Sequence, residues 1–169
     1  MIAKPTYLIA ELRGDIEPLV QEMRQRFNPG YVLWPIDITL AGSSGVGTIK
    51  EDQAQEKVIE LLSPIIEEHK FTRVKFSAIN RFPNTGIYVL SPERDNFDRL
   101  HNALTNSGVE FNTNPWPYNP HCTLRSAQDT SEELDQLFES IVLPAQSFIE
   151  CFSLYQPEQY GGRRLHKFQ

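Results

Sequence analysis

The sequence predicts an α+β fold: a duplicated, two-lobed (bilobal) domain in which two antiparallel β-sheets, flanked by helices, surround a central cleft with pseudo-two-fold symmetry. Patterns typical of strand, helix, strand, helix and strand occur twice in that order. The two copies align at an offset of about 80 to 84 residues, which places Asp37-Ile38-Thr39-Leu40 on His121-Cys122-Thr123-Leu124. We therefore interpret residues 1–169 as one domain with repeats 1–82 and 83–169. An accidental match between common α+β patterns is the alternative.

The first repeat begins with a strand predicted at residues 6–12. Apolar residues at helical spacing follow, with Asp15 as the N-cap, and Asn28-Pro29-Gly30 ends this helix. A strand around residues 37–41 then leads into a loop at residues 42–47. This loop is rich in glycine but lacks the Gly-Lys-Ser/Thr sequence of a nucleotide-binding P-loop, so it does not predict one.

The second helix contains Pro64 inside its apolar pattern, which should kink or shorten it. A long strand predicted at residues 73–82 completes the first repeat. The second repeat opens with a strand at residues 86–90, followed by a helix that begins at Asp95 and is ended by Gly108. The order of the elements is therefore the same as in the first repeat.

The remaining elements follow the second motif, whose residues 120–124 form a short predicted strand. Thr130 and Glu133 form a T-x-x-E capping box, which predicts that the last helix starts at Thr130. A closing strand is predicted at residues 147–155. A further strand at residues 164–168 should pair with it through the Gly-Gly turn that precedes it.

Composition excludes several classes of protein. Hydrophobic residues make up 40% and charged residues 22% of the chain, a globular balance that excludes a disordered or fibrous protein. No apolar run approaches the roughly 18 residues that span a bilayer, and the N-terminus does not resemble a signal peptide. The formal net charge of −6 argues against coating of long nucleic acid, which needs many cations. With two cysteines in the chain, we expect a reducing, cytoplasmic compartment.

The two aligned motifs put polar side chains on one face of each strand. Because side chains alternate along a strand, His121 shares a face with Thr123, and Asp37 shares a face with Thr39. Packing of the lobes about their axis would bring all four into one cleft. Two hydroxyls can bind phosphoryl oxygens while an ionisable pair moves protons on opposite sides of phosphorus. A structural histidine and a solvated aspartate are the alternatives.

The sequence Pro120-His121-Cys122-Thr123-Leu124 resembles the P-H-x-T-L motif of the two-histidine phosphoesterase superfamily, which contains 2′-5′ RNA ligase-like proteins and cyclic phosphodiesterases. The resemblance covers essentially the whole chain in length, element order and motif spacing. It implies that His121 transfers a proton and that Thr39 and Thr123 bind phosphate. Asp37 stands where the family has its first histidine, so the first motif departs from the pattern.

The departure at Asp37 leaves two functions open. An unperturbed aspartate is ionised at neutral pH, so the resemblance implies Asp37 as general base and His121 as general acid. The first function is a 2′-5′ RNA ligase-like phosphoesterase, weakened by the substitution, that acts on cyclic phosphate or 2′-5′ phosphodiester bonds of nucleotides or RNA ends. The alternative is a catalytically inactive relative that binds a nucleotide or an RNA 3′ end. A scaffold that binds a protein partner is a third interpretation.

Some residues outside the motifs are also candidates for contacts with a substrate. We select Trp116 and Tyr155, because aromatic rings stack on nucleobases, and Arg125, because a guanidinium binds phosphate. Core packing and solvated charge are their alternatives. The other histidines lack the spacing of a zinc site, so we expect no metal, and the resemblance implies no cofactor. We expect a monomer whose partner is a nucleotide or RNA end, with no membrane binding. The cations expected near the cleft are Lys75, Arg81, Arg125, Arg163 and Arg164.

Overall fold

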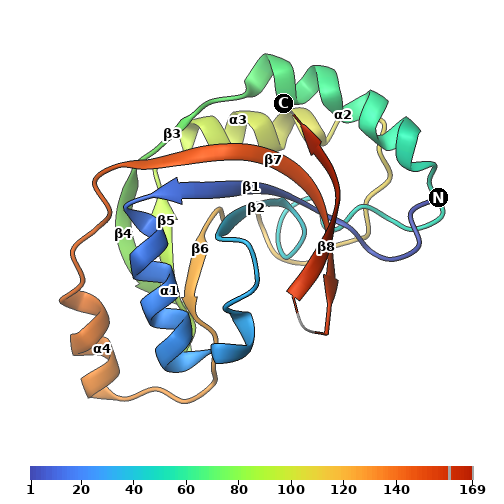
Figure 1. Ribbon diagram of the computed structural model, residues 1–169. Coiled ribbons are helices and arrows are strands. Elements are labelled where there is room, and N and C mark those ends of the chain that lie inside the picture. Colours follow the sequence, from blue (N-terminus) through green and yellow to red (C-terminus); the bar gives the residue numbers. More distant parts are fainter. Residues whose placement is uncertain (160, 169) are drawn as a thin grey trace.

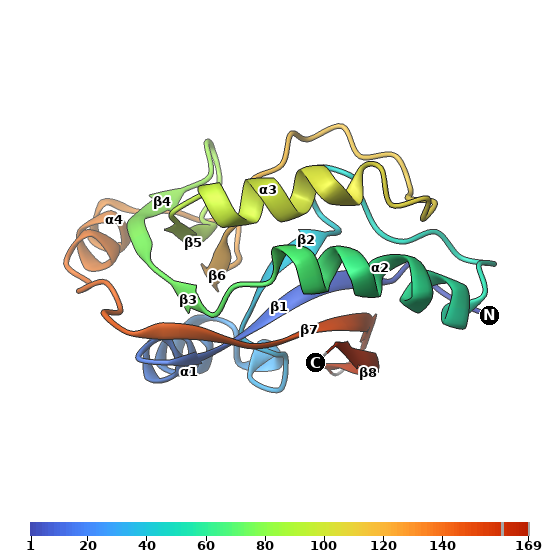
Figure 2. The same ribbon diagram turned by 90° about the horizontal axis from the view of Figure 1, so that it is seen from above.

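A computed structural model describes residues 1–159 and 161–168 (Figures 1 and 2). It confirms the α+β class with two antiparallel sheets. Among the described residues, no helix is long and apolar enough to cross a membrane. In chain order the elements are β1 (Tyr7–Gly14), α1 (Ile16–Phe27), the 3-10 helix η1 (Pro29–Tyr31), β2 (Asp37–Ala41), α2 (Gln55–His69), β3 (Arg73–Val74), β4 (Phe76–Arg81), β5 (Tyr88–Pro92), α3 (Asp95–Leu104), β6 (Cys122–Arg125), α4 (Glu132–Glu139), β7 (Ser147–Glu158) and β8 (Gly161–Phe168).

Each sheet combines strands from both halves of the chain. The larger sheet has the order β2-β1-β7-β3, with β8 paired to β7, and the smaller sheet has the order β4-β5-β6. All of these pairs are antiparallel. The last strand of each predicted repeat therefore lies in the sheet of the other repeat: β7 lies beside β1, and β4 lies beside β5. A duplicated unit that exchanges its last strand gives this topology.

The two motif strands, β2 and β6, lie at the edges of their sheets and share one irregularity. In β2 the residue Leu40 is extra relative to its partner strand β1, and in β6 the residue Leu124 is extra relative to β5. Such a bulge bends a strand and changes the direction of the side chains that follow it. The two motifs therefore have the same bulge at the same position.

The single long strand predicted at residues 73–82 is wrong, because the structure has two strands there. The segment β3 pairs with β7 in the larger sheet, and β4 pairs with β5 in the smaller sheet, with Lys75 between them. Figure 1 shows this segment crossing from one sheet to the other. The sequence of residues 73–82 has a nearly continuous strand pattern. The segment is two strands only because its two parts pair with different partner strands.

Three other expectations about the elements differ in detail. The helix α2 continues through Pro64, because Val58, Leu62 and Ile66 stay buried on both sides of it, and this burial offsets one lost hydrogen bond. The N-cap of α4 lies one residue later than predicted: the Ser131 hydroxyl, not that of Thr130, accepts from Leu134 N at 3.2 Å. The predicted Gly-Gly turn is wrong, since both glycines lie in β8; the connection includes residue 160, outside the described residues.

One cluster of buried apolar side chains joins the two sheets and their helices. The helices α2 and α3 lie together over one side of the larger sheet, and α1 lies on the other side of β1 (Figure 2). The packing is reciprocal: α1 contacts β6, and α3 contacts β2. Each motif strand is thus backed by a helix from the other half of the chain.

Candidate active site

Both motif strands show the predicted alternation of side chains. Every second residue is buried on one face, while the polar motif residues are half-buried on the other. The buried residues are Ile38, Leu40, Cys122 and Leu124, and the half-buried ones are Asp37, Thr39, His121 and Thr123. The apolar residues fix each strand to the core, which leaves the polar groups directed away from it.

The strands β2 and β6 approach each other where the two sheets meet. The thiol of Cys122 lies close enough to Asp37 for that residue to influence its pKa. The segment before β2 is also tied to the segment after β6, because the Asn28 side chain donates to Ser126 O at 2.9 Å and accepts from Ser126 N at 2.8 Å. These contacts bring the two motifs together although they lie far apart in the sequence.

A matching set of contacts joins the 42–47 loop, after β2, to the segment before β6. Gly45 N donates to Trp116 O at 2.9 Å, and Asn119 N donates to the Ser44 hydroxyl at 3.1 Å. Both contacts cross from the first motif to the second. We call residues 42–47 and 114–119 together the loop clasp.

The helix α3 supports the loop clasp through His101. Its Nδ1 donates to Leu40 O at 2.9 Å, and its ring stacks on Tyr118 with 3.7 Å between centroids and 3° between planes. Burial lowers the pKa of His101, although the Leu40 carbonyl opposes this effect, so the imidazole stays neutral near pH 7. The end of β2 is therefore held by an uncharged, stacked pair.

The Asp37 carboxyl lies in an environment that resists ionisation. Burial raises its pKa to about 6, and the charge of Glu11 adds to this; Arg24 and the hydroxyl of Thr39, which donates to Asp37 Oδ2 at 3.3 Å, act in the opposite direction. Glu11 and Asp37 are directly paired across β1 and β2, so their side chains share a face of the larger sheet. The carboxyl therefore titrates in the range where proton transfer at neutral pH is effective.

His121, the residue directly before β6, is held in one orientation. Its Nδ1 lies 2.7 Å from Asn119 O, and its ring packs edge-on against Phe82 at 5.1 Å between centroids. Because a carbonyl only accepts, Nδ1 carries the proton and the neutral ring keeps its lone pair on Nε2. Burial lowers the pKa of His121, against the effect of that carbonyl. Neutral His121 thus presents Nε2 as an acceptor.

Sequence reasoning missed two charged residues that shape the surroundings of Asp37. Glu11 is buried in β1, where it accepts hydrogen bonds from Ser153 at 2.6 Å and from Arg164. Burial alone would raise the pKa of Glu11, but these hydrogen bonds outweigh it and lower the pKa. Arg24 of α1, also buried, donates to three backbone carbonyls of the segment just before β2. A carboxylate inside an apolar strand pattern was the one sequence signal for Glu11.

The three candidates outside the motifs have different positions. Arg125 follows the β6 bulge and lies in the interior, where it donates to Gly86 O and Asp129 Oδ2, each at 2.7 Å. The structure therefore does not bring Arg125 together with the motif residues, because the bulge turns it away from Thr123. Trp116 is 68% exposed on the loop clasp. Tyr155 is buried in β7 and lines a pocket on the Asp37 side of the larger sheet.

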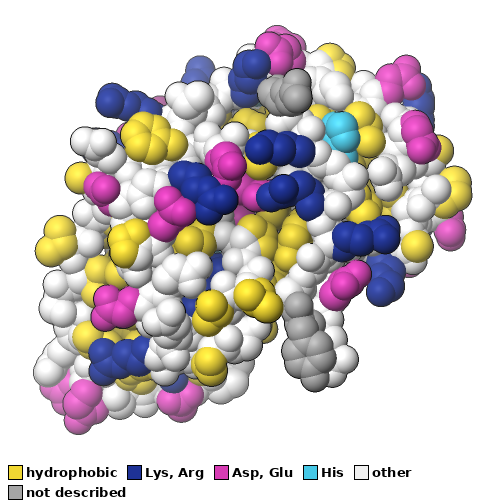
Figure 3. All heavy atoms as spheres, in the orientation of Figure 1, with side chains coloured by type: hydrophobic (Ala, Val, Ile, Leu, Met, Phe, Trp, Pro, Cys, Tyr) yellow, Lys and Arg dark blue, Asp and Glu magenta, His cyan; other side chains and the backbone are white. Residues whose placement is uncertain are grey.

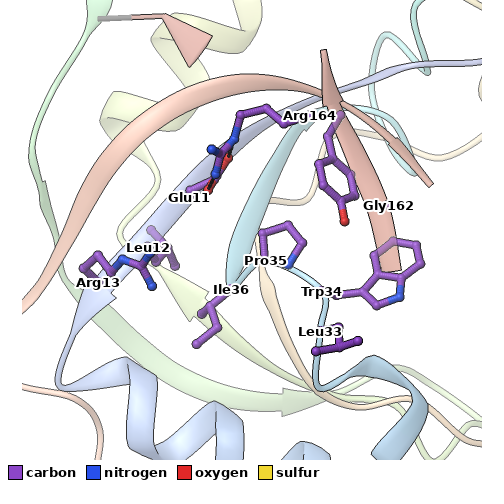
Figure 4. A pocket seen from close by; sticks show the side chains of 10 residues that line it. Glu11, Leu12, Arg13, Leu33, Trp34, Pro35, Ile36, Gly162 and Arg164 are labelled. Atoms are coloured by element: carbon purple, nitrogen blue, oxygen red, sulfur yellow. Dashed lines mark hydrogen bonds and ion pairs between the residues drawn. The ribbon is translucent and has the colours of Figure 1, made fainter. Parts of the chain in front are cut away.

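The other expected cations are also placed by the structure. Lys75 and Arg81 pair with carboxylates of Glu93 and Asp135. Arg164 lines the same pocket as Tyr155 and pairs with Glu11, as Figure 4 shows. On this face of the molecule, Lys and Arg side chains gather around a hollow in which hydrophobic side chains are visible (Figure 3). Within residues 1–159 and 161–168, no three His, Cys, Asp or Glu side chains are grouped as metal ligands.

Comparison with known proteins agrees with this architecture. The TT0787 protein of Thermus thermophilus superimposes with a TM-score of 0.60 at 18% identity, over 98% of this chain and 97% of that one. Escherichia coli LigT complexed with 3′-AMP gives a TM-score of 0.57 at 19% identity, over 98% and 97% of the two chains. Escherichia coli LigT complexed with ATP gives 0.56 at 20% identity, over 98% and 96%. At these identities the likeness shows the fold.

No curated protein gives a significant match to the sequence. The family model of the 2′-5′ RNA ligase superfamily matches residues 12–156, which include both motifs, the whole of the smaller sheet and the loop clasp. This match agrees with the resemblance that the P-H-x-T-L motif carries. The chain therefore belongs to the 2′-5′ RNA ligase superfamily.

Proposed function

We propose that this protein is a 2′-5′ RNA ligase-like phosphoesterase that cleaves cyclic phosphate or 2′-5′ phosphodiester bonds of nucleotides or RNA ends. The observation that carries the proposal is the approach of β2 and β6, each with a half-buried ionisable group two residues before a half-buried threonine. In this proposal Thr39 and Thr123 donate hydrogen bonds to the phosphoryl oxygens, and Asp37 and His121 transfer the protons.

The environments of the two ionisable groups support a definite assignment of roles. Burial raises the pKa of Asp37 to about 6 and lowers the pKa of His121, so both sites favour their uncharged forms. A neutral His121 accepts a proton at Nε2, and a protonated Asp37 donates one. This assigns the general base to His121 and the general acid to Asp37, the reverse of the roles implied by an unperturbed aspartate.

The proposed reaction on a 2′,3′-cyclic phosphate then balances as follows. Water attacks phosphorus while His121 takes one of its protons, and a new P–O bond forms. The bond from phosphorus to one ribose oxygen breaks, and that oxygen receives the proton of Asp37. The product is a phosphate monoester with a free neighbouring hydroxyl, and the enzyme returns its protons by exchange with solvent. A neutral acid also avoids a second anion facing the phosphate.

Nucleotides are the substrate class that the structural relatives support. Escherichia coli LigT has been crystallised with 3′-AMP, with ATP and with NADP+. This chain shares that fold over nearly its whole length. We therefore extend nucleotide binding to this chain as part of the proposal.

The test is an activity panel run in excess chelator. Substrates are 2′,3′-cyclic nucleotides and 2′-5′-linked dinucleotides, and proteins are the wild type, Asp37→Asn, His121→Ala and, as a control for histidine removal, His69→Ala. We expect turnover by the wild type and by His69→Ala, with a loss of about 10²-fold or more in the two site variants. Equal rates in all four proteins would overturn the catalytic proposal.

The same panel also tests the alternative function, a catalytically inactive relative that only binds its ligand. The observation that favours this alternative is the aspartate in place of the first histidine. In that case the wild type turns over none of the substrates but binds them, and Thr39→Val with Thr123→Val abolishes binding.

The assignment of roles has its own test. A phosphodiester with a p-nitrophenolate leaving group needs no general acid, so Asp37→Asn should regain activity on it while His121→Ala should not.

A further inference from the structure

The buried histidine of α3, His101, contacts the segments of both motifs at once. Its side chain belongs to a residue that is 6% exposed, and its helix lies beside β2 (Figure 2). Its Nδ1 donates to Leu40 O of the first motif, and its ring stacks on Tyr118, three residues before His121 of the second motif. His101 is thus a buried ionisable group that the proposed proton transfers do not use.

The hydrogen bond from His101 falls on the bulge of β2. Leu40 is the extra residue of this strand relative to β1, and the extra residue of a bulge is left out of the ladder of backbone hydrogen bonds. His101 supplies a donor to the Leu40 carbonyl at 2.9 Å. Because Leu40 directly follows Thr39, this bond fixes the backbone next to the phosphate-binding hydroxyl proposed for the first motif.

The ring stack fixes the segment that orients His121. The Tyr118 carbonyl accepts from Arg94 of α3 at 3.1 Å. The next residue, Asn119, donates its backbone N–H to the Ser44 hydroxyl, also at 3.1 Å. Asn119 O accepts in turn from His121 Nδ1 at 2.7 Å. The position of Tyr118 therefore determines where the acceptor of His121 lies.

The 42–47 loop encloses the His101 ring on its remaining edge. A Cβ atom at Gly45 would lie 2.2 Å from Cε1 and 2.4 Å from Nε2 of His101. The Nε2 edge therefore faces the backbone of the loop, in a space too small for a side chain. With one ring face on Tyr118 and Nδ1 bonded to Leu40, the ring cannot turn without losing its contact with one of the motifs.

From these contacts we infer that His101 is a positioning residue for the proposed reaction: it holds Thr39 of the first motif and His121 of the second in a fixed relative position. It acts through these two residues and not on the substrate itself. The inference rests on the proposed function for its effect on rate, because the alignment of the two motifs matters to turnover only if a phosphodiester reacts between them. A misplacement of about 1 Å can cost about 10²-fold in rate.

The first test uses two variants that each keep one contact of His101. His101→Asn keeps a donor for Leu40 O and loses the ring, whereas His101→Phe keeps a ring for Tyr118 and loses the donor. We expect each to lower kcat on 2′,3′-cyclic AMP by about tenfold, with KM changed less than about threefold, because misplaced groups raise the barrier more than they weaken ground-state binding. Asn102→Ala, at the exposed neighbour on α3, is the control and should change neither value. Wild-type kcat in either His101 variant would overturn the inference, because holding both motifs requires both contacts.

A spectroscopic measurement keeps the test independent of turnover. In protein labelled with ¹⁵N in its four histidines, the ring shifts of His121 report which nitrogen carries the proton. The neutral ring of the wild type should carry it on Nδ1, bonded to Asn119 O. We expect His101→Asn, checked for folding by circular dichroism, to shift His121 toward a mixture of both tautomers. His101→Phe, which keeps the stack, and Asn102→Ala should retain the wild-type form.

The outcomes separate this inference from the proposed function. If the wild type turns over no substrate, the proposed function fails, yet the tautomer shift in His101→Asn still supports the positioning of His121. Tyr118→Leu removes the other ring of the stack and gives the same comparison if His101→Asn does not fold. An unchanged His121 tautomer in the folded variants that lack the stack would overturn the positioning role whatever the activity.

Discussion

At the scale of single residues, burial of the Asp37 carboxyl lowers the stability of the fold at neutral pH and gives the carboxyl a pKa suited to proton transfer. Its pKa is raised from 3.8 to about 6 because burial disfavours the charged form more than Arg24 and Thr39 favour it. The folded protein therefore holds a proton that the unfolded chain has already released. The stability that the protonated carboxyl provides is complete below pH 3.8 and is lost as the pH rises through 6.

Replacement of this carboxyl should accordingly stabilise the protein. We expect Asp37→Asn to raise the free energy of unfolding by about 1 to 3 kcal/mol at pH 7, since asparagine has no charge to desolvate. The gain should be small at pH 4 and grow up to about pH 7. Urea unfolding of both proteins at several pH values measures it. A variant that is equally stable at pH 7, or less stable, would show that Asp37 ionises freely in the folded state.

Activity should also depend on the proton that the pair shares. The working form has one proton between Asp37, with a pKa of about 6, and His121, whose pKa lies below its ordinary 6.5. We expect kcat/KM to be bell-shaped, with its maximum on the acid side of pH 7 and a decline above it. Steady-state assays from pH 4.5 to 8.5, with circular dichroism as the check on folding, measure this profile. A rate that rises steadily to pH 8.5 would contradict it.

The residues of the site were predictable from sequence where a local pattern carried them. The D-x-T-L and H-x-T-L segments gave the four polar residues because strand alternation is a local property. Glu11 and Arg24 were not predictable in this way, since their roles arise from strand register and from the path of the chain before β2. Arg125 shows the limit of alternation: one extra residue at Leu124 turned it to the other face.

At the scale of elements, the loop clasp depends on a glycine. Gly45 has a φ of +73°, and a Cβ atom there would lie 2.2 Å from Cε1 of His101. We expect Gly45→Ala to lower the free energy of unfolding by about 1 to 3 kcal/mol and to reduce activity, because it displaces His101 from β2. Gly30→Ala is the control, since nothing lies within 4 Å of its added Cβ. Thermal unfolding and kcat/KM provide the readouts, and equal behaviour of the two variants would refute the role of the loop clasp.

The start of α4 gives a second comparison between neighbouring residues. The Ser131 hydroxyl accepts from Leu134 N, whereas the Thr130 hydroxyl accepts from Arg81. We expect Ser131→Ala to cost about 1 kcal/mol and Thr130→Ala clearly less, because a helix cap contributes more than one exposed side-chain hydrogen bond. Urea denaturation of the two variants measures this difference. A larger loss in Thr130→Ala would restore the cap predicted from the sequence.

Most elements were predictable because their signals lie within a few residues. The end of α1 at Asn28-Pro29-Gly30 and the motif strands follow from such signals. The division of residues 73–82 between two sheets was not predictable, because the strand pattern does not say which strand will be its neighbour. The same holds for the exchange of β4 and β7 between the two halves.

At the scale of the whole molecule, this exchange makes the two predicted repeats depend on each other. Without the second half, β1 and β2 lose β7, which lies between β1 and β3 in the larger sheet. Without the first half, β5 and β6 lose β4, and β6 loses the helix α1 that packs against it. The candidate active site also needs both halves of the chain, because each half supplies one motif and one side of the loop clasp.

A fragment experiment tests this dependence. Residues 1–82 and 83–169 are produced separately, divided in the hairpin between β4 and β5. We expect each fragment alone to lack cooperative unfolding, because a two-stranded remnant buries too little apolar surface to fold in water. Mixing them should restore a cooperative transition and, if the proposed function holds, activity on cyclic phosphates, because both motifs are needed to build the cleft. The full chain cleaved at the same position is the control for the broken connection. Cooperative unfolding of either fragment alone would mean that the repeats are independent domains, and the exchanged strands would then be an addition to two stable sheets rather than the feature that holds them together.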